Sequence, residues 1–295
     1  MKLRITLTAI IVSLYLMTNA QVVTVDTLMI RHFTGGATDS VSISTIDSIT
    51  FVYIYDTLAG GPGSIVLPGN ATCDTMYISV AGCGGLTTLT YNGYTYDLVE
   101  IGGQCWFAEN LQTTKYSDGS PIFYPGSNNT AWVNDSTGAY AWYDNDSSTY
   151  APDYGALYNW YSVDNAAGLC PTGWHVPTDC EWMYLEDTLG MSTAEQEDIG
   201  WRGTDEGDKL KETGTTHWAS PNTGATNSSG FTGLPGGFRH LSGTFYYIGN
   251  RGYWWSATQY SAPGAWLRYL YLGNAQVYRY NYSKRSGFSV RCVRD

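Results

Sequence analysis

Six cysteines constrain the fold of this chain more strongly than any other sequence feature. Their number is even and no CxxC pair occurs, which favours three disulfides if the chain leaves the reducing cytoplasm. A metal site is the rival interpretation, but the four histidines are scattered along the chain. Spacing alone does not select one pairing among the many that six cysteines allow. The cysteines are Cys73, Cys83, Cys105, Cys170, Cys180 and Cys292.

The N-terminus predicts export. Two basic residues precede a mostly apolar run, Ile5–Met17, and Thr18–Ala20 ends small enough for cleavage, so we expect a signal peptide over residues 1–20. The apolar run is too short to cross a bilayer, and no later stretch reaches the ~20 apolar residues that a spanning helix needs. Gln21 stands where a lipid-anchored protein would carry cysteine. We therefore expect a mature chain in the periplasm, on the cell surface or in the medium, without membrane insertion.

The composition excludes several classes of protein. Charged residues make up 14% of the chain, against ~25% in typical soluble domains, while Gly (34) and Tyr (25) are abundant. Loss of Lys2 and Arg4 with the signal changes the net charge from −11 to −13. Such acidity argues against a nucleic-acid partner, because nucleic-acid binders carry basic stripes. The composition is typical of a loop-rich extracellular fold rather than of a helical cytosolic enzyme.

The sequence divides into a small module, a linker and a main domain. Alternating side chains after the signal predict short strands, which we interpret as a β module over residues 21–58. A Gly- and Pro-containing break then begins a linker over residues 59–86, in which Cys73 and Cys83 can close a small loop. Residues 87–295 remain, enough for one sizeable core.

Helices are few in the main domain. Thr178–Glu181 matches a capping box, and apolar side chains at helical spacing continue the pattern to a stop at Gly190. Ser192 begins a second, shorter capping pattern, and Ala156–Asp164 is a third predicted helix. Long loops rich in Gly, Asn, Ser and Thr separate the remaining short strands, so we predict an α+β fold.

A tyrosine-rich hairpin is predicted near the C-terminus. Ala265–Leu272 and Ala275–Tyr282 alternate as strands, and Gly273 with Asn274 suits the turn between them. Successive side chains of a strand point to opposite faces, so pairing of the two strands would gather five tyrosines on one face. They are Tyr269, Tyr271, Tyr278, Tyr280 and Tyr282.

This concentration of tyrosine favours a binding face. Nine of the 25 tyrosines fall between Tyr246 and Tyr282, with Ser, Gly and Asn among them. Tyrosine offers a large, rigid contact that is both apolar and polar, and antibody binding loops combine it with the same small residues. The alternative is that the tyrosines pack in a strand core. A core would use Val, Ile, Leu and Phe more readily, because each buried hydroxyl needs a partner.

Six segments, spread in order over about two thirds of the chain, carry family motifs. They are Tyr91–Tyr96 (YNGYTY), Ile101–Leu111 (IGGQCWFAENL), Cys170–Pro177 (CPTGWHVP), Leu234–Gly237 (LPGG), Gly252–Ser256 (GYWWS) and Gly287–Asp295 (GFSVRCVRD). They resemble the Fibrobacter succinogenes major paralogous domain, which is frequent in secreted proteins of Fibrobacter and Bacteroidetes. Ile46–Phe51 is similar to a short module often found ahead of such domains.

That family in turn resembles the C-type lectin fold of formylglycine-generating enzymes and of the variable proteins of diversity-generating retroelements. The resemblance implies a C-type-lectin-like domain over residues 87–295, with few helices, short antiparallel strands and long loops. It also implies that residues 254–295 form a variable region on a fixed scaffold. The candidate binding positions are Tyr260, Ser261, Pro263, Gly264, Leu267, Tyr269, Tyr271, Gly273, Tyr278, Tyr280, Tyr282 and Arg285.

The resemblance also bears on the cysteines. It implies the pairs Cys170–Cys292 and Cys105–Cys180, which leaves Cys73–Cys83. Formylglycine-generating enzymes hold copper with two redox-active cysteines in their C-terminal part, but here Cys292 is the only cysteine after Cys180. No P-loop, GxSxG or HExxH pattern is present either. We therefore expect a scaffold without catalysis.

Calcium is a minor alternative to a site without cofactors. Asp144, Asn145 and Asp146 place three oxygen-bearing side chains in one loop, and calcium prefers oxygen ligands. Short clusters of Asp and Asn are more often turns. The Glu-Pro-Asn and Gln-Pro-Asp triplets of sugar-binding C-type lectins do not occur. We expect no cofactor, with calcium at this loop as the weaker hypothesis.

The preferred functional hypothesis is a secreted or cell-surface binding protein. Its tyrosine-rich face would recognise an extracellular protein or glycan, and whether a retroelement diversifies that face stays open. One alternative is a carbohydrate- or cell-wall-binding module of fixed specificity in a polysaccharide-utilising surface system. Another is a structural surface or filament subunit.

Overall fold

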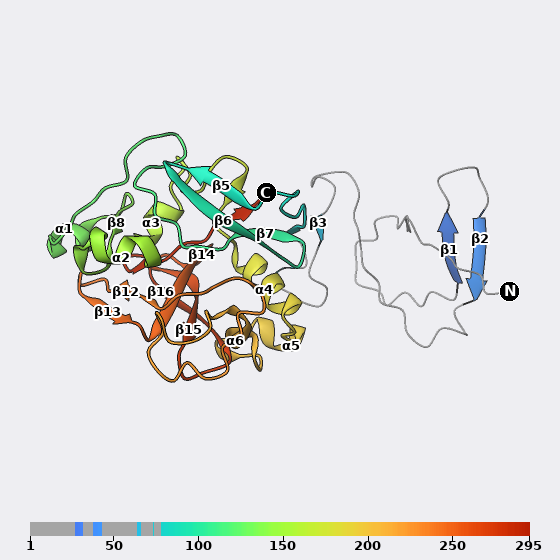
Figure 1. The fold of residues 1–295 in the computed structure, drawn as a ribbon. Coiled ribbons are helices and arrows are strands. Elements are labelled where there is room, and N and C mark those ends of the chain that lie inside the picture. The colour runs from blue at the N-terminus through green and yellow to red at the C-terminus, as the bar shows by residue number, and fades with distance from the viewer. Residues whose placement is uncertain (1–26, 32–37, 43–63, 66–72, 74–77) are drawn as a thin grey trace. The chain divides into compact units, whose positions relative to one another are not determined.

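The computed structural model describes residues 27–31, 38–42, 64–65, 73 and 78–295 (Figure 1). The chain forms two compact units, residues 1–52 and residues 53–295. In the first unit, β1 (Thr27–Arg31) pairs antiparallel with β2 (Thr38–Ser42), with Met29 opposite Ser40. The predicted signal peptide and the rest of the predicted β module lie outside the described residues.

The second unit opens with a short pair of strands, followed by a five-stranded sheet. β3 (Ser64–Ile65) pairs antiparallel with β4 (Ile78–Ser79). The five-stranded sheet contains β5 (Thr88–Tyr91), β6 (Tyr94–Ile101), β7 (Gln104–Phe107), β10 (Trp174–His175) and β18 (Val293–Arg294). Its order is β10, β18, β7, β6, β5, and every pair is antiparallel. The C-terminal strand β18 thus lies beside β7 from the start of the domain.

A larger sheet carries most of the C-terminal half. Its nine strands within the described chain are β8 (Tyr140–Ala141), β9 (Leu157–Asn159), β11 (Gly200–Arg202), β12 (Gly236–Arg239), β13 (Phe245–Ile248), β14 (Arg251–Ser261), β15 (Gly264–Tyr271), β16 (Val277–Ser283) and β17 (Gly287–Phe288). The order is β11, β16, β15, β14, β12, β17, β9, β8, and β13 pairs with β12. The β12–β14 contact is parallel and the other pairs are antiparallel.

The helices are short and lie toward two ends of the domain (Figure 1). One group is α1 (Asn129–Asn134), α2 (Ser147–Tyr154) and α3 (Trp160–Val163), with the 3-10 turn η2 (Tyr143–Asn145). The other group is α4 (Asp179–Thr188), α5 (Thr193–Gln196) and α6 (Glu206–Leu210). The domain is therefore a mixed fold of mostly antiparallel strands with few helices, as predicted.

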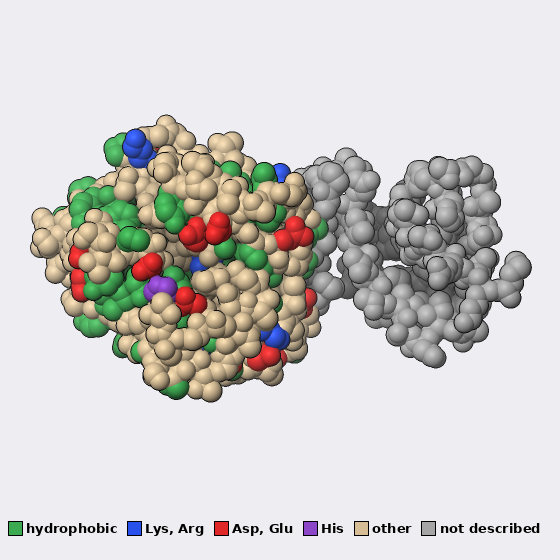
Figure 2. All heavy atoms as spheres, viewed as in Figure 1, with side chains coloured by type: hydrophobic (Ala, Val, Ile, Leu, Met, Phe, Trp, Pro, Cys, Tyr) green, Lys and Arg blue, Asp and Glu red, His purple; other side chains and the backbone are tan. Residues whose placement is uncertain are grey.

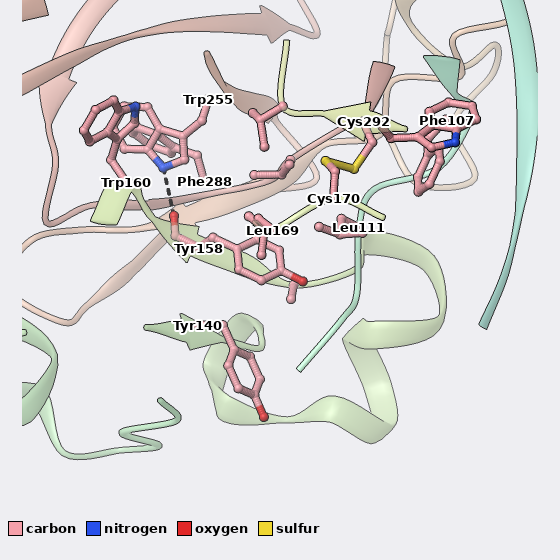
Figure 3. Packing of buried hydrophobic residues seen from close by; sticks show 14 of the residues in the cluster. Phe107, Leu111, Tyr140, Tyr158, Trp160, Leu169, Cys170, Trp255, Phe288 and Cys292 are labelled. Atoms are coloured by element: carbon pink, nitrogen blue, oxygen red, sulfur yellow. Dashed lines mark hydrogen bonds between the residues drawn. A yellow bond between two sulfur atoms is a disulfide. The ribbon is translucent and has the colours of Figure 1, made fainter. Parts of the chain in front are cut away.

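Two apolar clusters lie on opposite faces of β14. Successive side chains of a strand alternate between faces, so the neighbours Trp254 and Trp255 enter different clusters. Trp255 packs against Phe288, with ring centroids 4.4 Å apart, and its indole N–H donates to the carbonyl of Tyr158 at 2.8 Å (Figure 3). Trp254 packs against Phe231 on the side of α4. The strand that carries the Trp pair thereby joins both halves of the core.

Two of the three predicted helices form where expected. Thr178 caps α4: its hydroxyl accepts from the Glu181 amide at 3.2 Å, and the Glu181 carboxylate accepts from the Thr178 amide at 2.7 Å. α5 follows Ser192, although the Ser192 hydroxyl donates to the Glu195 carboxylate at 2.6 Å instead of capping the backbone.

The third predicted helix, Ala156–Asp164, is wrong in its first half. Leu157–Asn159 forms β9, which pairs with β8 and β17, and only Trp160–Val163 is helical. All three β9 residues are buried, so sheet pairing and burial override the local helical pattern.

Three disulfides connect the six cysteines: Cys73–Cys180, Cys83–Cys105 and Cys170–Cys292. The predicted pairs Cys73–Cys83 and Cys105–Cys180 are wrong, whereas Cys170–Cys292 is the pair that the resemblance implied (Figure 3). The reason is that the Gly82 amide donates to the Gly103 carbonyl at 2.7 Å, which places the next cysteine beside Cys105 at the β6–β7 turn.

The disulfides bear on the environment of the chain. Disulfides persist in oxidising compartments such as the periplasm and the extracellular space, so three of them indicate such an environment. None of the helices in the described residues is long and apolar enough to cross a membrane.

Candidate ligand-binding site

The tyrosine-rich hairpin forms as the alternation predicts. β15 and β16 pair antiparallel, with Leu267 opposite Tyr280 and Tyr269 opposite Tyr278. On the other side, β14 pairs with β15 and places Tyr253 opposite Tyr269. Three adjacent strands therefore present aromatic side chains to one face of the sheet.

This face borders a cavity of about 370 Å³, which we call the tyrosine pocket. Ligand pockets in proteins measure roughly 300–1,000 Å³, so the tyrosine pocket lies at the small end of that range. Aromatic side chains dominate its wall, and no Asp or Glu is among the lining residues. The wall consists of Phe238, His240, Tyr246, Tyr247, Arg251, Tyr253, Leu267, Tyr269, Tyr278, Tyr280, Tyr282 and Phe288.

The rings of the wall hold one another in place. Tyr269 stacks on Tyr278 with centroids 4.3 Å apart, and Tyr253 stacks on Phe288 at 5.3 Å. Trp201 of β11 supports the first pair edge-on from outside the pocket, at 5.1 Å from Tyr269 and 4.9 Å from Tyr278. Such offset and edge-to-face contacts stabilise each pair by about 0.5–1.5 kcal/mol beyond its buried area. The aromatic wall is thus preorganised.

Exposure divides the pocket into a floor and a rim. Leu267 is 1% exposed and Tyr253 is 6% exposed, so they form the floor. Tyr246, Tyr247 and Tyr280 are between 41% and 45% exposed and form the rim. A ligand in the pocket would therefore contact the rim rings first. Apolar and aromatic side chains also gather over the region of α2, β12 and β13, where Lys and Arg are sparse (Figure 2).

Tyr247 reaches the rim through an uncommon backbone conformation. Its φ is +66°, in the left-handed region that bulky residues rarely adopt. Its ring stacks on Phe238 at 6.0 Å and lies under the guanidinium of Arg251, 4.4 Å from the ring centroid. Backbone strain of this kind tends to occur at functional sites.

Burial and charge tune the titrating groups of the wall. Burial raises the pKa of Tyr269 to about 12, even though the positive charge of Arg251 works against the rise. Burial likewise raises the pKa of Tyr253 and of Tyr282. Burial works to lower the pKa of Arg251, but its hydrogen bond with Tyr253 and the surrounding tyrosines outweigh burial, and the net shift is upward. At neutral pH the hydroxyls of Tyr253, Tyr269 and Tyr282 are thus neutral, and Arg251 is a guanidinium cation.

The predicted binding positions divide between the pocket and its surroundings. Leu267, Tyr269, Tyr278, Tyr280 and Tyr282 line the pocket. Tyr271 packs outside it against Trp201, and Tyr260 lies against Trp266, whose neighbour Arg279 belongs to the other face of the hairpin. The remaining positions lie at the end of β14, the start of β15, the turns between β14, β15 and β16, and the turn after β16: Ser261, Pro263, Gly264, Gly273 and Arg285.

Seven lining residues were not among the predicted positions: Phe238, His240, Tyr246, Tyr247, Arg251, Tyr253 and Phe288. Three of them, Tyr246, Tyr247 and Tyr253, belong to the tyrosine-rich stretch, so the high density of tyrosine in that stretch was a usable signal. Tyr253 and Arg251 also follow from extending the β14 alternation back from Trp255 by two and four residues. Phe238 and His240 gave no such local signal.

The loop considered for calcium has a capping role in this structure. One carboxylate oxygen of Asp146 accepts from the amides of Ser148 and Thr149 at 3.0 and 3.1 Å and caps α2. The hydrogen bonds from Ser148 and Thr149 lower the pKa of Asp146 to about 2. In the part of the chain that the structure describes, no three His, Cys, Asp or Glu side chains come together as metal ligands.

Comparison with known proteins identifies the domain that contains the pocket. The family described as the Fibrobacter succinogenes major domain matches residues 99–294. The chain belongs to this family. The match runs from within β6 to the end of β18, so the Fibrobacter succinogenes major domain includes the whole tyrosine pocket. No curated protein and no solved structure matches the chain.

Proposed function

We propose that this Fibrobacter succinogenes major domain protein is an exported, non-catalytic binding protein whose ligand enters the tyrosine pocket. The observation that carries the proposal is the pocket itself: about 370 Å³, walled by stacked aromatic rings and open at a rim of tyrosines. Tyrosine is enriched at binding hot spots, because a rigid ring gives a large contact for little lost side-chain freedom.

The proposal includes a C-type-lectin-like scaffold. It is supported by the family motifs and by the mixture of short antiparallel strands with few helices. In such a protein the strands and disulfides hold the wall while the rim meets an extracellular protein or glycan. All six cysteines are engaged in disulfides, which leaves no thiol pair for chemistry of the formylglycine-generating type.

Fixed specificity for a carbohydrate or cell-wall ligand is the second candidate, and one observation favours it over a diversified face. Six of the lining residues, from Phe238 to Tyr253, precede residue 254, where the proposed variable region begins. Leu267, a candidate variable position, is 1% exposed and belongs to the floor. A retroelement that changes only residues 254–295 would therefore leave half of the wall unchanged.

Two experiments test these proposals. Glycan and protein arrays probed with the full exported chain should show saturable binding to one ligand class, competed by the free ligand. The absence of any saturable signal on both arrays would contradict a binding function. The gene neighbourhood distinguishes a diversified binding face from one of fixed specificity. A reverse transcriptase gene beside a near-identical template repeat favours diversification, and the absence of such a gene favours fixed specificity.

A further inference from the structure

Arg251 differs from the other buried or half-buried arginines of the domain. Arg268 and Arg279 bond to the carboxylate of Asp179, and Arg202 bonds to Glu186. Arg239 and Arg291 donate to backbone carbonyls. Within the described residues, Arg251 bonds to neither a carboxylate nor a backbone carbonyl, although the chain has 26 acidic residues against 15 Lys and Arg.

The guanidinium of Arg251 contacts aromatic rings and one hydroxyl, which compensate its positive charge only in part. Its guanidinium lies over three rings, 4.4 Å from the centroid of Tyr247, 5.3 Å from Tyr271 and 5.5 Å from Tyr269. Its Nη1 donates to the Tyr253 hydroxyl at 3.3 Å, and among the described residues its buried Nε has no hydrogen-bond partner. A guanidinium has five N–H donors in a fork that fits a carboxylate.

We propose that the tyrosine pocket binds a terminal carboxylated sugar residue, whose carboxylate pairs with Arg251. The inference rests on the proposed binding function and names its ligand class. The pyranose ring presents apolar C–H faces that pack on tyrosine rings, and its hydroxyls match the tyrosine hydroxyls of the wall. The wall contains no Asp or Glu to repel the acid, so the pocket is the locally cationic part of an acidic protein.

The acidity of the whole chain explains why the recognised residue is terminal. With a net charge of −11, the surface would repel an acidic polymer laid along it. A chain end that enters a pocket of about 370 Å³ brings one carboxylate to Arg251 and leaves the next charges outside. At physiological ionic strength, exposed charges more than about 8 Å apart are largely screened.

The competing explanation is that Arg251 only holds the rings in place by cation–π contacts, which stabilise by about 0.5–2 kcal/mol each. These two roles differ in one measurable respect. A carboxylate-binding arginine discriminates acidic from neutral sugars, whereas a ring-holding arginine supports the binding of both equally.

The test uses three oligosaccharides and the full exported chain in calorimetric titrations. The first probe is a galacturonic-acid-terminated trisaccharide, and the second is the same trisaccharide with its terminal carboxyl reduced to an alcohol. The third is an otherwise neutral trisaccharide whose terminal residue carries one sulfate. The variants are Arg251→Gln and Arg251→Lys, with Lys115→Gln as the control, because Lys115 is an exposed cation outside the pocket.

We expect the wild type to bind the acidic probe at least tenfold more tightly than the reduced probe. Arg251→Gln should abolish that difference without weakening the binding of the reduced probe, Arg251→Lys should restore part of it, and Lys115→Gln should leave it intact. Equal binding of acidic and reduced probes by the wild type, or equal loss of both in Arg251→Gln, would overturn the inference. Preference for the sulfated probe would overturn the carboxylate assignment.

Failure of this inference is distinguishable from failure of the binding function. Arg251-dependent binding of an acidic peptide, with no sugar bound, would overturn the sugar class but keep the pocket as the site. Loss of an array-identified ligand on Tyr280→Ala, without any effect of Arg251→Gln, would overturn the inference and leave the proposed function standing.

Discussion

At the scale of single residues, Asp179 illustrates how this acidic chain uses its few buried charges. Its carboxylate lies between two arginines of the hairpin, 2.5 Å from Arg268 Nη1 and 2.6 Å from Arg279 Nη2. Arg268 also bonds to Glu186 at 2.6 Å, and all four side chains are at most 4% exposed. This network attaches α4 to the face of β15 and β16 opposite the tyrosine pocket.

Asp179→Asn should destabilise the domain strongly. Removing one partner of a buried ion pair leaves an uncompensated charge and costs about 3–5 kcal/mol. We expect urea denaturation at pH 7 to show a loss in this range, whereas Asp198→Asn, at an exposed carboxylate, should change the free energy of unfolding by less than about 0.5 kcal/mol. Equal effects of the two substitutions would contradict the buried network.

The same residue predicts a pH dependence. Burial works to raise the pKa of Asp179, but Arg268 and Arg279 outweigh it and hold the pKa below its usual value of 3.8. A depressed pKa in the folded state means that this contribution to stability is complete above pH 3.8 and is lost as the pH falls further. We expect Asp179→Asn to lack that part of the acid-induced loss. An unchanged acid profile in the variant would count against the assignment.

At the scale of elements, the N-cap of α4 can be predicted from the sequence, and its contribution to the free energy of unfolding can be measured. Thr178→Ala removes the hydroxyl that accepts from the Glu181 amide, and N-cap losses of this kind cost about 1 kcal/mol. Ser192→Ala is the matched control, because the Ser192 side chain makes no capping bond at α5. We expect denaturation to show a loss for Thr178→Ala and almost none for Ser192→Ala. The reverse order would mean that the capping geometry is wrong.

The elements that could be predicted from sequence are those whose signals are local. A capping box contains its own hydrogen-bond partners, so Thr178 and Glu181 predict the start of α4. Alternation and a turn likewise predict that β15 pairs with β16 and which tyrosines share a face. Leu157–Asn159 was misassigned because its strand form depends on pairing with β8 and β17, and β17 lies far away in the chain.

At the scale of the whole molecule, the disulfides connect segments that local patterns cannot relate. Cys73–Cys180 closes a separation of 107 residues, and Cys83–Cys105 closes one of 22. The tyrosine pocket also combines separate segments of the chain, because β12, β13 and β14 complete the wall to which the hairpin of β15 and β16 contributes one part. The sequence predicted the five pocket residues that lie on the hairpin of β15 and β16, but not the seven that lie outside it.

Disulfide mapping tests the arrangement at this scale. Proteolysis of the unreduced protein followed by mass spectrometry should yield one peptide pair containing Cys73 and Cys180 and another containing Cys83 and Cys105. From loop entropy, replacing the first pair by serine should cost about 4.8 kcal/mol and the second about 3.4 kcal/mol. Recovery of a Cys73–Cys83 peptide would refute the pairing described above.

The most direct test of the central claim compares two tyrosines of equal exposure. Tyr280 on the rim of the tyrosine pocket and Tyr124 outside it are each 41% exposed. With the strongest ligand found on the arrays, calorimetric titration of Tyr280→Ala should show about 30-fold weaker binding, the effect of a hot spot worth about 2 kcal/mol. Tyr124→Ala should bind like the wild type. Unchanged affinity in Tyr280→Ala, or an equal loss in both variants, would contradict the tyrosine pocket as the binding site.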